Sequence, residues 1–116
     1  MQYLLLIYQN EAEMAGRKEA EMAAMHAEYG TFTQSIIKSG NFKGGDALQP
    51  TATATTVRVR NGKTMATDGP FAETREQLAG YYLIEAKNLD EASAIAARVP
   101  SAKVGSIEVR PIRVFE

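Results

Sequence analysis

The stretch that decides the fold reads Thr67-Asp68-Gly69-Pro70-Phe71-Ala72-Glu73-Thr74-Arg75-Glu76. Its Asp-Gly-Pro step predicts a tight turn, because glycine adopts conformations that other residues resist and proline fixes its own backbone and donates no hydrogen bond. An aromatic side chain follows at once, and then acid, hydroxyl, base and acid lie close together. A loop that only joined two elements would need fewer polar and charged side chains, so we expect a candidate site at this loop.

Strands and helices are predicted on both sides of the loop. The residue patterns predict two helices: one from Arg17 or Lys18 to Ser39, closed by Gly40, and one capped by Asn88 and ended by Pro100. The predicted strands are Gln2–Tyr8, a bulged strand within Phe42–Leu48, Val57–Arg60, Lys63–Thr67, Gly80–Ala86 and Ile107–Arg110. The hairpin turn Asn61-Gly62 joins the third and fourth of these strands. This order favours one α+β domain, with an antiparallel sheet and two helices on one face.

Apolar spacing predicts which sides of these elements are buried. Val57 and Val59 alternate with arginines, so the valines are expected inside. Between Asn10 and Gly16 we expect only a loose turn, because the glycine interrupts the helical pattern. The expected inner face of the first helix is Met22, Met25, Tyr29, Phe32 and Ile36, and that of the second is Leu89, Ala92, Ile95, Ala96 and Val99.

Composition excludes several classes of function. The 116 residues form one domain, and 13 basic against 14 acidic side chains give no argument for nucleic acid or a charged membrane surface. There is no cysteine and one histidine, so no disulfide, thiolate or ordinary transition-metal site is expected, and no cofactor. No apolar run has transmembrane length, and we expect a cytoplasmic protein with no membrane partner.

The segment from Thr67 to Tyr82 also resembles a known family. It is similar to the signature of the DGPF branch of the YCII-related family, and the likeness extends over nearly the whole chain. Further matching segments are Tyr3 to Tyr8, Leu48-Gln49-Pro50, Thr53-Ala54-Thr55-Thr56 and Ile107-Glu108-Val109-Arg110-Pro111. The resemblance implies a ferredoxin-like α+β fold of the dimeric α/β-barrel type, with a homodimer formed through the sheet.

The resemblance implies little about activity, and this chain departs from the proton-transfer site proposed for some relatives. Several YCII-related proteins carry a histidine on the first helix, proposed to pair with an aspartate as an acid/base dyad. Counted back from Gly40, that position falls on Tyr29 here, with His26 one turn earlier. Histidine suits proton transfer near neutral pH, whereas the ordinary pKa of tyrosine, about 10, makes it a poor base. His26 also fits a solvated helix flank, and Tyr29 also fits plain core.

Each residue of the central loop has two readings. Asp68 is either an anionic ligand anchor or general base, or the acceptor that closes an Asx-type turn. Phe71 either lines a pocket or anchors the loop to the core. Glu73, Arg75 and Glu76 are expected to form an ion network that stiffens the loop, or to hold a polar ligand.

Three function classes follow from these readings and from the resemblance, the third being a scaffold subunit with no pocket chemistry. The first is a cofactor-free enzyme or small-molecule-binding protein, with Asp68, His26 and Tyr29 as candidate catalytic residues. Its candidate ligand-binding residues are Gly44, Gly45, Gly69, Pro70, Phe71, Glu73 and Arg75. The second is a regulatory or interaction module, because relatives are often encoded beside extracytoplasmic-function sigma factors.

Overall fold

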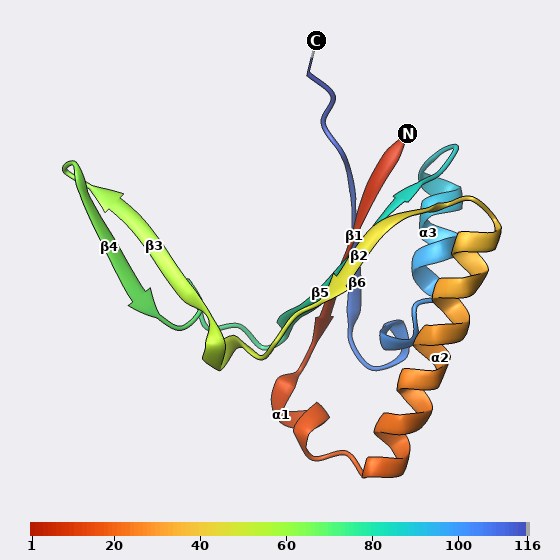
Figure 1. Ribbon diagram of the computed structural model, residues 1–116, viewed down its shortest axis with the longest axis horizontal. Helices are drawn as coiled ribbons and strands as arrows, with labels where there is room; N and C mark the ends of the chain where they lie inside the picture. Colours follow the sequence, from red (N-terminus) through yellow and green to blue (C-terminus); the bar gives the residue numbers. More distant parts are fainter. Residues whose placement is uncertain (116) are drawn as a thin grey trace.

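The computed structural model describes residues 1–115 (Figure 1). The elements in chain order are β1 (Gln2–Gln9), α1 (Glu11–Ala15), α2 (Glu19–Lys38), β2 (Phe42–Ala47), η1 (Thr51–Thr53), β3 (Thr55–Arg60), β4 (Lys63–Asp68), β5 (Gln77–Glu85), α3 (Leu89–Ala97), η2 (Pro100–Lys103) and β6 (Ser106–Pro111). No helix in this part of the chain is long and apolar enough to cross a membrane.

Four strands form the main sheet, in the order β2-β5-β1-β6. Every neighbouring pair is antiparallel, and β1 lies in the middle with β5 on one side and β6 on the other. The strand order, the strand directions and a helix after β1 and after β5 agree with a ferredoxin-like α+β fold. The pairing of β2 with β5 has an irregular register between Phe42 and Gly44, which confirms the predicted bulge.

The core lies between this sheet and the two long helices, which cover the same face (Figure 1). Alternate side chains of β1 enter it, and Leu5 is completely buried between Tyr3 and Ile7. Phe32 and Ile36 of α2 are buried against this row. Full burial of such a side chain stabilises the fold by about 1.5–3 kcal/mol, so this row holds the helices to the sheet.

The opposite face of the sheet has no helix over it in the described residues (Figure 1). The register places Leu4 and Leu6 of β1 and Leu83 of β5 on this face, and all three are half-buried. At its β6 side Arg110 Nε donates to Glu108 Oε2 at 2.8 Å. The centre of the open face is therefore apolar, and charged residues lie at its edge.

Capping and glycine signals in the sequence predicted the ends of the two long helices closely. The helix α2 lies within one or two residues of its predicted bounds, and Gly40 beyond it has a φ of 82°. Asn88 caps α3 by accepting a hydrogen bond from the Glu91 backbone at 2.9 Å. The loose turn expected after Asn10 is instead the short helix α1, because the Asn10 side chain accepts from the Glu13 backbone and supplies the missing cap.

Two predicted inner faces are only partly buried. In α2 the N-terminal half extends beyond the core, so Met22 is exposed although Phe32 and Ile36 are buried. In α3 Leu89 is exposed, contrary to the expectation, because it begins the helix where the chain is still outside the core. The rest of that face, Ala92, Ile95 and Ala96 with Val99 beyond the helix, is buried as predicted.

The strands β3 and β4 form a separate two-stranded arm that projects away from the main sheet (Figure 1). Asn61 and Gly62 have φ values of 52° and 75°, which confirms the predicted hairpin turn. The expected burial of the valines is wrong: Val57 is 61% and Val59 is 59% exposed, because the arm reaches past the body of the molecule. The radius of gyration, 16.2 Å, accordingly exceeds the roughly 13 Å of a compact domain of this length.

The same substitution should have opposite effects at two glycines. A Cβ at Gly105 would lie 2.0 Å from the Tyr8 carbonyl oxygen, a backbone atom of the central strand, whereas a Cβ at Gly30 in α2 meets nothing within 4 Å. We predict that Gly105→Ala lowers the free energy of unfolding by about 2 kcal/mol or more. Gly30→Ala should raise it by about 0.5–1 kcal/mol, because alanine loses less entropy in a helix. Urea unfolding of both variants tests this, and equal signs would contradict the packing described here.

Candidate functional site

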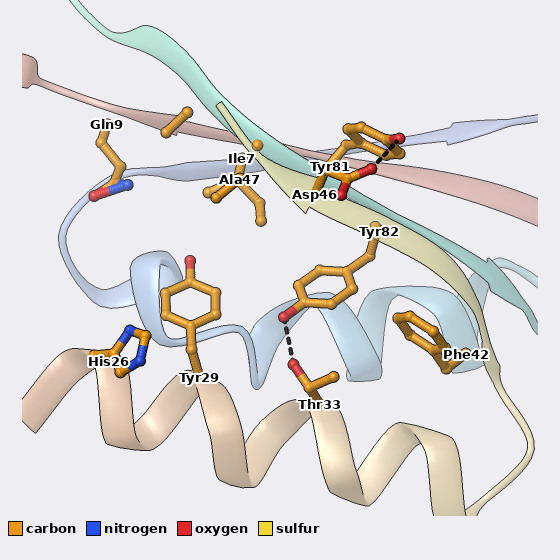
Figure 2. A pocket seen from close by; sticks show the side chains of 13 residues that line it. Ile7, Gln9, His26, Tyr29, Thr33, Phe42, Asp46, Ala47, Tyr81 and Tyr82 are labelled. Carbon is orange, nitrogen blue, oxygen red and sulfur yellow. Dashed lines mark hydrogen bonds between the residues drawn. The ribbon is translucent and has the colours of Figure 1, made fainter. Parts of the chain in front are cut away.

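A cavity of about 350 Å³ lies between α2 and the strands β2 and β5 (Figure 2). His26, Tyr29 and Thr33 line it from the helix. They are three and four residues apart and therefore share one side of α2. Ile7 and Tyr82 line it from the sheet, where strand alternation turns them toward the helices.

Hydrogen bonds inside the chain fix the hydroxyl groups of this pocket. The hydroxyls of Tyr82 and Thr33 are 2.6 Å apart and join the sheet to α2 across the cavity (Figure 2). The Tyr29 hydroxyl is hydrogen-bonded to Ser101 Oγ in η2, and Ser101 is fully buried. These contacts hold two aromatic walls of the pocket in place.

A second polar pair, Tyr81 and Asp46, lies on the open face of the sheet, because Tyr81 is paired with Leu6. The Tyr81 hydroxyl donates to Asp46 Oδ2 at 3.0 Å (Figure 2). This hydrogen bond, together with the charge of Asp46, raises the pKa of Tyr81. Tyr81 therefore stays neutral and donates a hydrogen bond to the carboxylate across the β2–β5 pair.

Tyr29 is a neutral hydrogen-bonding group. Burial raises its pKa above the usual value of 10.0, and the hydrogen bond to Ser101 only partly offsets this. Ionising Tyr29 would therefore destabilise the fold as the pH rises past about 10, and below that pH the phenol remains protonated. It can donate or accept a hydrogen bond beside a ligand, but it is no general base near neutral pH.

The pocket brings together some of the predicted site residues. His26, Tyr29 and Gly45 all line it, and Gly44 is the preceding residue of β2. The sequence interpretation missed Gln9, Thr33, Asp46, Tyr81 and Tyr82 as lining residues. The three- and four-residue spacing from His26 through Tyr29 to Thr33 was a usable signal for Thr33, whereas the strand residues needed the sheet register.

The loop after β4 lies elsewhere in the single chain. Asp68, Gly69, Pro70 and Glu73 line a separate hollow, to which Thr51 of η1 also contributes. Neither this hollow nor the α2 pocket includes Phe71 or Arg75 in its wall. The sequence-predicted residues thus fall into two groups, one at α2 and one at the loop.

The loop is closed without the Asp68 side chain. The Gly69 backbone donates to the Ala54 carbonyl at 2.7 Å, and Thr56 Oγ1 donates to the Gly69 carbonyl at 2.8 Å. Among the described residues the Asp68 carboxylate accepts no hydrogen bond, so the Asx-type turn does not form.

Two further expectations for the loop are wrong. Phe71 is 78% exposed and does not anchor the loop to the core. Across residues 1–115 no ion pair joins Glu73, Arg75 and Glu76. The loop is held instead by Asn10 Nδ2, which donates to the Arg75 carbonyl at 3.1 Å, and by Gln77 Nε2, which donates to the Thr74 carbonyl at 2.6 Å. Hydrogen bonds to backbone carbonyls therefore stiffen the loop in place of the expected ion pairs.

The part of the chain that the structure describes has no cluster of potential metal ligands. No three His, Asp or Glu side chains of residues 1–115 lie close enough together to hold a metal ion. What the α2 pocket offers is a partly open space lined by aromatic, aliphatic and small residues, with neutral hydroxyls, one amide and one imidazole.

Comparison with known proteins assigns the family. The sequence matches the YCII-related domain over residues 1–116. It is 35% identical, over 118 aligned residues, to an uncharacterized protein of Rhizobium meliloti (strain 1021), and this alignment covers 100% of the chain and 95% of the relative. The chain therefore belongs to the YCII-related family.

Proposed function

We propose that this protein binds a small organic molecule in the α2 pocket, as a binding protein or as a cofactor-free enzyme. The observation that carries the proposal is the partly open cavity of about 350 Å³, lined by aromatic and aliphatic side chains with a few polar groups. Pockets for small ligands are typically about 300–1,000 Å³ and have this kind of lining. We also propose membership of the DGPF branch, on the segment from Thr67 to Tyr82.

The lining indicates an uncharged ligand. No lysine or arginine lines the pocket, so an anion would be buried without a cation to pair with it. The carboxylate of Asp46 is already engaged by Tyr81. His26 lies at the exposed rim and is the lining group suited to move a proton near neutral pH. In an enzymatic version His26 transfers the proton, and Tyr29 donates a hydrogen bond to the ligand while its oxygen accepts from Ser101.

Blocking the pocket tests this proposal. Ala47→Phe places a ring at the exposed edge of the cavity, and Ala20→Phe makes the same change on an exposed part of α2 outside it. A metabolite screen by thermal shift should find a compound that raises the melting temperature of the wild type and of Ala20→Phe, because a ligand of the native state stabilises it. Ala47→Phe should lose that shift. A compound that stabilises Ala47→Phe equally well does not occupy this pocket.

Asp68 is proposed as the polar contact of a separate ligand site, the hollow that it lines together with Gly69 and Glu73. Its carboxylate is exposed and accepts no hydrogen bond in the described chain, so its charge is free for a donor group outside the loop. Because Gly69 and Thr56 close the turn, the loop does not need this carboxylate to keep its shape.

Asp68→Asn should therefore leave the free energy of unfolding within about 0.5 kcal/mol of the wild type, as expected of an exposed side chain with no structural partner. The same substitution should abolish binding of a compound from the screen that Ala47→Phe still binds, because such a compound occupies a site outside the α2 pocket. Calorimetric titration of both proteins decides the point, and equal affinities would reduce Asp68 to a residue of the loop.

We propose a homodimer formed through the open face of the sheet. Leu4, Leu6 and Leu83 form an apolar centre that no element of the described chain covers, and such a face favours association with a second copy. The exposed valines of the arm are a further apolar surface. They favour the alternative function, a regulatory or interaction module linked to extracytoplasmic-function sigma factors, if the screen yields no ligand.

Light scattering tests the dimer. We expect twice the mass of one chain at micromolar concentration for the wild type. Leu6→Lys should give a monomer, because it buries a charge at the centre of the proposed interface. Ile37→Lys, the control, lies on an exposed part of α2 and should remain dimeric. A monomeric wild type, or a dimeric Leu6→Lys, contradicts this interface.

A further inference from the structure

Gln9 is the polar member of an apolar row. Tyr3, Leu5 and Ile7 of β1 point toward the helices, and strand alternation gives Gln9, the last residue of the strand, the same direction. Its side chain lies at one end of the α2 pocket, near the hydroxyl end of the Tyr29 ring (Figure 2).

The amide of Gln9 has no partner in the described chain. Its Oε1 is buried and accepts no hydrogen bond. The neighbouring amides contrast with it: Asn10 Oδ1 caps α1, and Gln77 Oε1 accepts from the Glu11 backbone at 2.9 Å. A buried acceptor without a donor destabilises a fold, so folding alone gives no reason for an amide at Gln9.

The other polar groups near Gln9 are already engaged. The Tyr29 hydroxyl is bonded to Ser101, and the Tyr82 hydroxyl to Thr33. The unpartnered buried acceptor in the pocket wall is therefore Gln9 Oε1. Because this atom is shielded in the free chain, the Gln9 side chain turns toward the cavity before a ligand's donor satisfies it. A hydroxyl group also fits if the amide is rotated by half a turn, because a hydroxyl both donates and accepts.

We propose that Gln9 is the specificity residue of the pocket and selects a neutral, mainly aromatic or aliphatic molecule that carries a hydroxyl group. The inference rests on the proposed function of the α2 pocket and names its ligand class. The apolar body of the ligand lies among Ile7, Tyr82 and Phe42, and its hydroxyl group meets the Gln9 amide. A matched hydrocarbon without the hydroxyl fills the same space and leaves the amide unpaired.

The test compares two probes of nearly equal size, 2-naphthol and naphthalene. Their fluorescence can be followed directly because the protein has no tryptophan. For each protein the quantity compared is the ratio of the naphthalene Kd to the 2-naphthol Kd at neutral pH. One hydrogen bond to a buried group corresponds to about a tenfold change in this ratio. Gln9→Leu should therefore lower the ratio about tenfold, and naphthalene should bind this variant at least as tightly as the wild type.

Two further variants complete the design. Gln34→Leu makes the same change on an exposed part of α2 and should keep the wild-type ratio. Gln9→Met, which has an unbranched side chain, replaces Gln9→Leu if the latter does not fold, and should lower the ratio in the same way.

The outcomes separate this inference from the proposed function. An unchanged ratio in a folded Gln9 variant that still binds both probes overturns the role of Gln9 and leaves the pocket standing. A wild type that binds neither probe, or an Ala47→Phe variant that binds both as tightly as the wild type, overturns the pocket as the binding site and this inference with it.

Discussion

The antiparallel pairing of β1 with both β5 and β6 is the interaction on which the rest of the structure depends. Because β1 is the central strand, its alternation assigns a face to every residue opposite it: Leu5 and Tyr82 face the helices, and Leu4 and Leu83 face away. The helix-facing row packs the core and ends at Gln9 in the α2 pocket. The other row forms the open face. The core, the candidate site and the proposed dimer interface are thus three consequences of one strand register.

Signals that act over a few residues predicted the fold well. Gly40 ended α2, Asn88 capped α3, and Asn61-Gly62 formed the turn of the arm, because each depends on backbone geometry that the residue itself determines. Burial was predicted less well. Val57 and Leu89 have the right spacing for an inner face, but spacing shows only that a face is apolar, and whether another element covers it depends on the whole chain.

The candidate site was predicted in part for the same reason. Helical spacing brought His26 and Tyr29 to the pocket, since residues on one side of a helix stay together. The density of chemical groups around Asp68 drew attention to a loop that lies outside this pocket in the single chain. Gln9 and Tyr82 entered the site only through the sheet register, and the sequence does not say which strands are neighbours. A polar residue at the end of a strand attracts no attention in the sequence, because the sequence does not show whether its side chain faces the core or the solvent.

The arm of β3 and β4 differs from the body of the molecule because it has no buried core of its own. Its side chains add almost nothing to the core, so substitutions at Val57 or Val59 leave the sheet and the pocket unchanged. The arm can therefore change its surface, and with it what the protein associates with, without any change in the packing of the interior.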